Sequence, residues 1–220
     1  MTEGSSGEAE HYRREAMGAF AHEVRTPLTS IRMVLELARR QSGAGPLVLD
    51  AELGGMLRQS VDDLQGLADD LQEASRLERG RLVVGAGPAD LSAAVEAARE
   101  LLGGRIEIAG PTPDSIEGPW DAPRLVRAIA GFSESANRIG DGSGRVRFQC
   151  VRGDRTVQLV FESGEPNDEG KPIAADAGFA FFRSRQFVLA MGGAVDCARS
   201  ERHARITATL PTARSGAARV

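Results

Sequence analysis

The sequence is poor in cysteine, in aromatic residues and in long hydrophobic runs, and each shortage excludes a class of protein. Its two cysteines, Cys150 and Cys197, show no C-x-x-C spacing, so neither a disulfide framework nor a zinc site is expected. Aromatic residues make up 5% of the 220 residues, too few for a surface that stacks bases or sugars. No apolar run approaches the roughly 18 residues of a membrane-spanning helix, and no signal-peptide core is present. We therefore expect a cytoplasmic protein that binds no metal and no membrane.

Basic charge is also in short supply. The 27 lysines and arginines are outnumbered by 31 aspartates and glutamates, which gives a net charge of −4. A protein that neutralises phosphates along DNA or RNA needs the opposite balance. Nucleic acid is therefore not expected as a partner.

The N-terminal third has the periodicity of two long helices. Residues 10–40 place apolar side chains three or four positions apart, at Phe20, Val24, Leu28, Ile31, Leu35 and Ala38. After the turn-forming segment QSGAGP, a near-heptad repeat follows at Leu53, Leu57, Ser60, Leu64, Leu67, Leu71, Ala74 and Leu77. Two helices alone cannot bury both stripes. Residues 1–80 are therefore predicted to form an antiparallel hairpin that pairs with a second copy into a homodimeric four-helix bundle.

A second domain is predicted over residues 81–213, where short alternating segments are broken by Gly, Pro and Asp. We expect helices at about 89–102, 121–138 and 179–191. The expected strands lie at about 81–84, 105–108, 145–151, 156–162, 194–199 and 204–210. The fold class is thus α+β: a helical hairpin followed by an α/β sandwich, with helices on one face of an open mixed sheet.

The residues best suited to chemistry lie in the first helix, around His22. Helical spacing places His22 on the flank of the apolar stripe, so its imidazole should reach solvent. Neutral imidazole is a good nucleophile near pH 7, and Glu23 is placed to hold one ring N–H and offset developing positive charge. Thr26, one turn further on, could position a water or a phosphoryl oxygen. Pro27 costs the helix about 3 kcal/mol, which a purely structural helix would be expected to avoid.

Isolated exposed histidines are usually only solvated surface residues, so the neighbours of His22 carry the argument. The other two histidines lack such neighbours. His11 lies in a polar lead-in and His203 in the basic segment SERHAR, and both are expected at the surface.

The segment FAHEVRTPLTSIRMVLELA resembles the phosphoacceptor box of the histidine kinases of two-component signalling. This resemblance implies that His22 is phosphorylated and that Glu23 and Thr26 match the E-x-x-T pair associated with phosphatase chemistry. It extends over about residues 12–211, because WDAPRLVRAI and LAMGGAVDCARSERHARITATLP are similar to segments of the family's ATP-binding domain. The resemblance therefore implies a phosphotransfer hairpin followed by a domain of that kind.

The nucleotide-binding motifs of that domain are degenerate here. The family expects two asparagines four residues apart, where this chain has Gly131 and Ser135, and Asn137 lies about 200° round the helix. The adenine-binding D-x-G-x-G motif becomes Glu162-Ser163-Gly164-Glu165-Pro166, and Asp168-Glu169-Gly170 lies beyond the strand. The G-x-G-L turn becomes Gly178-Phe179-Ala180-Phe181, where side chains crowd a phosphate-binding backbone. Four lost contacts of about 1.5 kcal/mol each would weaken ATP binding on the order of 10⁴-fold.

The combination resembles phosphorelay histidine phosphotransferases built like a kinase core. It implies a homodimer in which His22 shuttles a phosphoryl group between receiver-domain aspartates without ATP or another cofactor, fed by an upstream hybrid kinase. The receiver would supply its own Mg²⁺. Hairpin geometry suggests a receiver-docking face formed by Thr26, Thr29, Ser30, Met33, Ala68, Leu71 and Gln72. Two alternatives stay open: a sensor kinase with a divergent ATP site, and a non-catalytic scaffold that binds a receiver.

Overall fold

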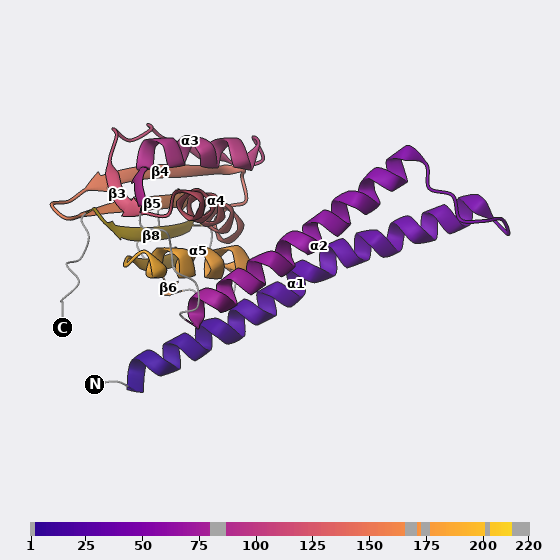
Figure 1. The fold of residues 1–220 in the computed structure, drawn as a ribbon, viewed down its shortest axis with the longest axis horizontal. Coiled ribbons are helices and arrows are strands. Elements are labelled where there is room, and N and C mark those ends of the chain that lie inside the picture. Colours follow the sequence, from indigo (N-terminus) through magenta and orange to yellow (C-terminus); the bar gives the residue numbers. More distant parts are fainter. Residues whose placement is uncertain (1–2, 80–86, 166–170, 173–176, 201–202, 213–220) are drawn as a thin grey trace.

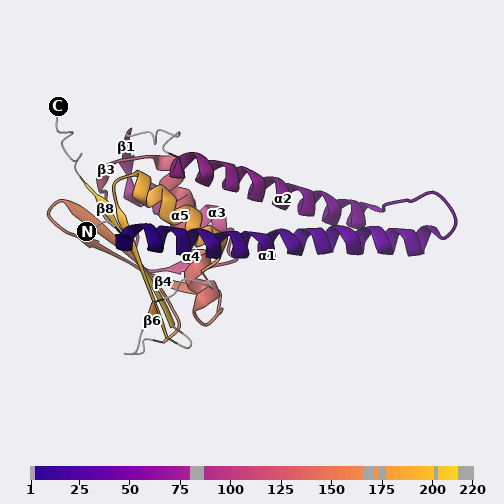
Figure 2. The same ribbon diagram turned by 90° about the horizontal axis from the view of Figure 1, so that it is seen from below.

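A long helical hairpin and an α/β domain docked against its base make up the molecule (Figure 1). The computed structural model describes residues 3–79, 87–165, 171–172, 177–200 and 203–212. The tip of the hairpin projects far from the α/β domain, and the views in Figures 1 and 2 both place α5 next to the base of the hairpin. The two parts predicted from the sequence are therefore present, in the predicted order.

The hairpin consists of α1 (Glu3–Ser42) and α2 (Ala51–Glu78). Helix α1 has 40 residues and is about 60 Å long. Helix α2 begins sharply because the Asp50 side chain accepts a hydrogen bond from the Leu53 N–H at 2.8 Å. Within the described residues, neither helix is apolar enough over a sufficient length to cross a lipid bilayer.

The two helices share only part of the predicted apolar stripe. Val34, Ala38 and Leu53 are buried between them near the tip. Leu28 and Leu35 of the predicted stripe instead remain 50% and 41% exposed in the single chain. One partner helix covers about one side of α1, so the rest of the apolar surface faces away from α2.

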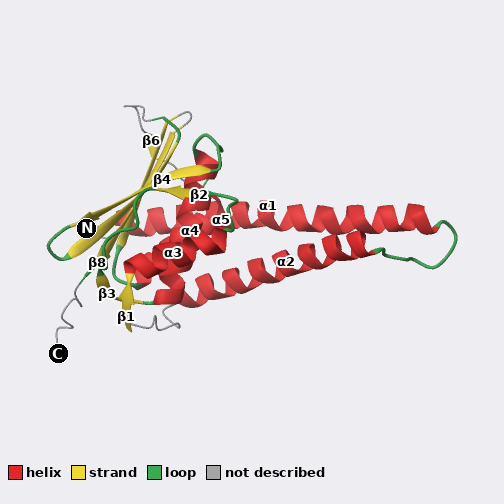
Figure 3. Cartoon of the chain, turned by 90° about the horizontal axis from the view of Figure 1, so that it is seen from above, coloured by secondary structure: helices red, strands yellow, loops and turns green. Residues whose placement is uncertain are grey.

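The α/β domain contains a six-stranded mixed sheet with all of its helices on one face (Figure 3). The helices are α3 (Leu91–Leu102), α4 (Ala122–Ile139) and α5 (Gly178–Ala190). The strands lie in the order β2-β4-β5-β8-β7-β6, and only the β2–β4 pair is parallel. Their bounds are β2 Glu107–Ala109, β4 Arg145–Arg152, β5 Thr156–Ser163, β6 Lys171–Pro172, β7 Ala194–Ser200 and β8 His203–Pro211.

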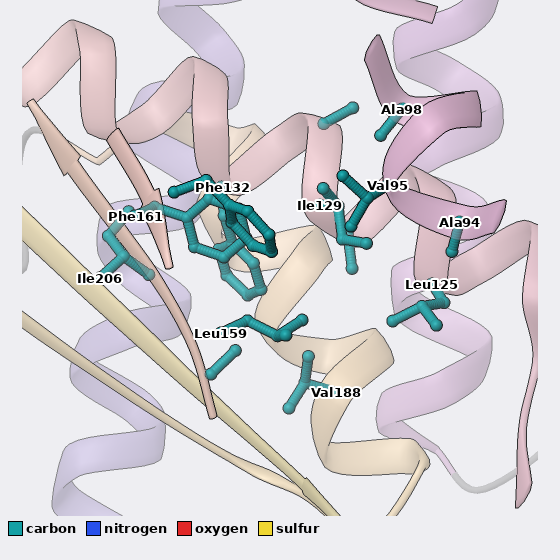
Figure 4. Packing of buried hydrophobic residues seen from close by; sticks show 14 of the residues in the cluster. Ala94, Val95, Ala98, Leu125, Ile129, Phe132, Leu159, Phe161, Val188 and Ile206 are labelled. Carbon is teal, nitrogen blue, oxygen red and sulfur yellow. The ribbon is translucent and has the colours of Figure 1, made fainter. Parts of the chain in front are cut away.

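The core lies between α4, α5 and the sheet. Burial alternates along β4 and over the first four residues of β5, which matches the period-2 pattern of a strand with one face turned inward. Phe132 of α4 packs against Phe161 of β5 at a ring-centroid distance of 5.7 Å (Figure 4). Trp120 is fully buried, and its indole N–H donates to the Pro211 carbonyl at 2.7 Å. This core fixes α4 and α5, which carry the residues that face the hairpin.

Three features differ from the sequence prediction: a second sheet, the burial of His203 and the short strand β6. A two-stranded sheet, β1 (Gly87–Asp90) with β3 (Glu117–Trp120), was not expected because each strand has four residues and contains a proline. His203 was expected at the surface but is 9% exposed, because it begins β8 between β5 and β7. The predicted strand at 81–84 lies outside the described residues. Apart from β6, the remaining described strands and helices of the domain agree with the prediction within about three residues.

Candidate functional site

His22 is exposed on α1, next to the surface where the α/β domain meets the hairpin. Thr26 is exposed one turn further along, whereas Pro27 is buried. Proline cannot donate a hydrogen bond, so the carbonyl of Glu23 loses its usual helical partner. The imidazole is therefore accessible to a large partner, as the sequence predicts.

The Glu23 side chain contacts the α/β domain. Its Oε1 accepts a hydrogen bond from Arg138 Nη1 at 2.8 Å and from the Phe179 backbone N–H at 3.2 Å. The side chain is 18% exposed, whereas that of Arg138 is 48% exposed. No hydrogen bond between Glu23 and His22 is found among the described residues. The sequence argument placed Glu23 beside His22 along the chain but could not reveal a partner 115 residues away.

A network of ion pairs joins α2 to the α/β domain. Asp70 accepts hydrogen bonds from Arg127 and Arg183, and Glu73 accepts from Arg124 and Arg127. The exposed fractions of these side chains lie between 14% and 34%, so solvent screens them less than it screens surface pairs. Sequence reasoning missed this network, although Asp70/Glu73 and Arg124/Arg127 share an i,i+3 spacing that could have suggested matching helix faces.

Apolar contacts close the same interface. The Phe20 and Phe179 rings meet edge to face with centroids 5.2 Å apart. Ala16 of α1 and Ala74 of α2 are buried with Phe179, and Leu71 packs against this cluster. The base of the hairpin therefore docks on the first turn of α5.

The predicted receiver-docking residues lie on both helices of the hairpin. Most are exposed in the single chain, and their roles stay predictions; these exposed residues are Thr26, Thr29, Met33, Ala68 and Gln72. Ser30 is half-buried and its hydroxyl donates to the Thr26 carbonyl at 3.3 Å. Leu71 differs from the others because it packs at the interface with α5.

A cavity of about 820 Å³ lies between the hairpin and the α/β domain. Its lining mixes carboxylates with arginines, among them Asp63 of α2 and Glu134 and Arg138 of α4. Burial raises the pKa of Glu134, and the nearby Glu23 raises it further, while Arg105 opposes the shift. Burial likewise lowers the pKa of Arg183, which Glu23 partly counteracts. Burial and the Glu23 carboxylate therefore both act on the charged groups at this interface.

The positions expected to hold ATP phosphates lie where α4 meets α5. A Cβ atom added at Gly131 would overlap Ser184 Oγ and would lie 3.2 Å from the Ala180 carbonyl oxygen, so a side chain there would force α5 or Ser184 to shift. Ser135 is 2% exposed and its Oγ has no hydrogen-bond partner. Beside it, a cavity of about 180 Å³ is lined by Ser135, Ala180, Glu23, Glu134, Arg138 and Ala177. Sites for ligands of drug size usually measure about 300–1,000 Å³.

The remaining degenerate positions make contacts within the chain. Glu162, at the adenine-binding position, pairs with Arg205 at 3.2 Å and with Arg147 at 3.8 Å. The Gly164 carbonyl accepts from Arg147 Nη2 at 3.1 Å. Asn137 Oδ1 accepts from the Gly144 N–H at 2.8 Å, so it stabilises the turn after α4.

Residues 166–170 and 173–176, which include Asp168-Glu169-Gly170, lie outside the described residues. Among the described part of the chain, no group of three or more metal-ligating side chains is found. Gly178 has a φ of +78°, which suits glycine, and a Cβ there would lie 2.2 Å from Arg138 Nη1. The described residues at the expected nucleotide-binding positions thus fit a nucleoside triphosphate poorly.

Comparison with known proteins places the hairpin in a defined class. Residues 12–80 match the His Kinase A (phospho-acceptor) domain. The signal transduction histidine-protein kinase BaeS of Escherichia coli (strain K12) is 31% identical over 159 residues, which cover 70% of this chain and 33% of that protein. The sensor protein KdpD of Mycobacterium tuberculosis (strain ATCC 25618 / H37Rv) is 26% identical over 213 residues, covering 85% of this chain and 24% of that protein. This chain thus spans about a third or less of these two relatives.

Solved structures show the same fold. Histidine kinase AdeS of Acinetobacter baumannii superimposes with a TM-score of 0.65 at 19% identity, covering 87% of this chain and 98% of that chain. Histidine kinase ThkA, in a complex with response regulator protein TrrA, superimposes with a TM-score of 0.56 at 17% identity. This match covers 96% of this chain and 67% of that chain. At these identities the likeness concerns the fold alone: a two-helix hairpin followed by an α/β sandwich.

Proposed function

We propose that the chain is a histidine-kinase-like two-component signalling protein in which His22 exchanges a phosphoryl group with receiver-domain aspartates without using ATP. The observation that carries the proposal is the exposed His22 within the matched phospho-acceptor segment. Exposure matters because a receiver is a whole domain, and its aspartyl phosphate must reach the imidazole nitrogen.

The transfer step makes limited demands on this chain. A lone pair on one ring nitrogen of His22 attacks the phosphorus of the receiver's aspartyl phosphate. The N–P bond forms as the P–O bond breaks, and the electron pair of that bond leaves on the aspartyl carboxylate. The proton on the other ring nitrogen stays, so the imidazole becomes cationic and a nearby carboxylate stabilises it. Attack by the aspartate of a second receiver reverses the step. Mg²⁺ held by the receiver shields the transferring phosphoryl group.

The hairpin supplies the partner surfaces. Its exposed apolar side chains support pairing with a second copy into a four-helix bundle; they include Leu28, Leu35 and Leu37 on α1 and Met56 and Val61 on α2. The receiver docks beside His22, on the exposed residues Thr26, Thr29 and Gln72. The upstream donor in this scheme is a hybrid kinase whose own receiver carries the phosphoryl group.

The degenerate cleft supports the part of the proposal that excludes ATP. The close packing of α5 against Gly131 and the volume of the cavity beside Ser135 both disfavour a triphosphate between α4 and α5. A second candidate, an ATP-dependent sensor histidine kinase, is better favoured by the comparisons, because BaeS and KdpD bear the names of a kinase and a sensor. Geometry and relatives therefore point to different sources of the phosphoryl group.

Two incubations distinguish these sources. The parent chain, His22→Ala and the control His11→Ala are each mixed with γ-labelled ATP and Mg²⁺, and separately with receivers charged by labelled acetyl phosphate. The proposal requires label on the parent and on His11→Ala from receivers only, with none on His22→Ala. Label from ATP alone would establish the kinase instead. Absence of label from both sources, together with retention of a receiver on the immobilised chain, would establish a non-catalytic scaffold.

A further inference from the structure

The carboxylate of Glu23 occupies the N-terminus of α5. Helix α5 has 13 residues, and its N-cap position, Ala177, provides no side-chain hydrogen bond to the first turn. Glu23 Oε1 accepts a hydrogen bond from the backbone N–H of Phe179, which has no partner within the helix, although the two residues are 156 positions apart. The positive end of the helix dipole favours an anion at this place. Glu23 thus caps α5 from another domain.

Arg138 completes this cap. Its Nη1 donates to the same Oε1 atom that accepts from Phe179, so a cation and a helix N-terminus both hold one carboxylate. Gly178 leaves room for the arrangement, because a Cβ atom there would lie 3.0 Å from Glu23 Oε1. Glu23 can reach this position only while α5 rests on the hairpin.

The surrounding contacts hold α5 in that place. Arg183 of α5 is tied to Asp70 of α2, and Phe179 packs against Phe20 of α1. Separation of the α/β domain from the hairpin would therefore break the Glu23 hydrogen bonds as well.

We propose that Arg138 is a positioning residue for the histidine chemistry, which acts by keeping Glu23 away from His22 while the α/β domain is docked. This inference rests on the proposed function at His22. Glu23 serves the docked state as a helix cap. In the undocked state it is free to stabilise the positive charge that develops on the imidazole. A receiver that binds the hairpin in competition with α5 would release Glu23 at the moment when transfer begins.

The test uses phosphoramidate, a small donor that needs no docking surface. Attack by the His22 nitrogen on zwitterionic phosphoramidate forms the N–P bond and breaks the donor P–N bond, and the donor nitrogen leaves as ammonia. Phosphorylation of His22 in the full chain is followed by intact-protein mass spectrometry. Arg138→Ala should react about fivefold faster than the parent, because weakening the cap enlarges the undocked population. Arg138→Lys, which keeps the cation, should remain near the parent rate.

Two comparisons separate positioning from a general loss of structure. In the background Glu23→Gln, Arg138→Ala should give no acceleration, because no carboxylate remains to be released. Arg145→Ala removes another exposed arginine, which pairs with Glu107 at 3.6 Å in the β2–β4 region, and should leave the rate unchanged. An equal rate in Arg138→Ala and the parent, or acceleration that persists in Glu23→Gln, overturns the inference and leaves the proposed function intact. If phosphoramidate never modifies His22 in any variant, both fail together.

Discussion

Replacement of Asp70 by asparagine should loosen the α/β domain from the hairpin. Asp70 is 14% exposed and pairs with Arg183, which is 15% exposed, and with Arg127, which is 34% exposed. The pair with Arg183 is worth about 1.5 kcal/mol at this burial, and the more exposed pair with Arg127 about 0.5 kcal/mol. Arg127 also retains Glu73. The sum of about 2 kcal/mol corresponds to a roughly 30-fold larger undocked population.

Amide hydrogen exchange measures this population directly. The Phe179 N–H is bonded to Glu23 only in the docked state, so its exchange rate should rise roughly 30-fold in Asp70→Asn. At 1 M salt the difference between variant and parent should shrink, because the Debye length falls to about 3 Å. Asp69→Asn is the matched control, since Asp69 is exposed and accepts a hydrogen bond from Gln65 of the same helix at 3.1 Å. Equal exchange in Asp70→Asn and Asp69→Asn would refute the reasoning.

Three further predictions concern the α/β domain and its stability. Gly131→Ala should lower the free energy of unfolding by about 1–3 kcal/mol, because the added methyl group overlaps α5. Gly55→Ala, which places a methyl group in open space on α2, should raise the free energy of unfolding by about 0.5–1 kcal/mol. Urea titration measures both changes, and equal effects of the two variants would contradict the packing at Gly131. Hydrogen bonds from Ser115 and other neighbours lower the pKa of Asp90 from 3.8 to about 2, so this carboxylate stabilises the fold above about pH 4 and the effect is lost as the pH falls toward 2. Asp90→Ala should therefore cost about 1 kcal/mol at pH 7 and much less at pH 2, as acid-dependent urea titrations can show; a cost that does not change with pH would contradict this. Burial raises the pKa of Cys197 from 9.0 to about 12, so alkylation of its peptide, followed by mass spectrometry at pH 8, should run roughly 10²–10³-fold slower in the folded than in the unfolded chain, and comparable rates would refute the burial.

Local pattern was sufficient for most of the fold. The three-and-four spacing of α1 and the heptad-like spacing of α2 predicted the hairpin, and the short alternating segments predicted β4 and β5 to within a residue. Such periodicity is a property of one continuous segment, so it can be recognised without knowledge of residues far away in the sequence. The strands β1 and β3 gave no such pattern, because four residues with a proline read as a turn.

The candidate site was predictable only where it depended on sequence neighbours. His22 and Thr26 lie on one exposed side of α1, as helical spacing required. The partners of Glu23 come from α4 and α5, and no periodicity connects residues 115 and 156 positions apart. The burial of His203 could not be predicted for the same reason, since it depends on the strands on either side of β8. Contacts across domains therefore required the structure.

The exposed leucines and methionines of the projecting half of the hairpin have a thermodynamic consequence. In the proposed pairing of two hairpins, that half completes its core only when two chains meet, so its folding equilibrium includes a concentration. Dilution alone would then melt the tip of the hairpin, while the α/β domain, with its own core, would persist. The amount of this protein in a cell would in that way set how much of it has a folded hairpin tip.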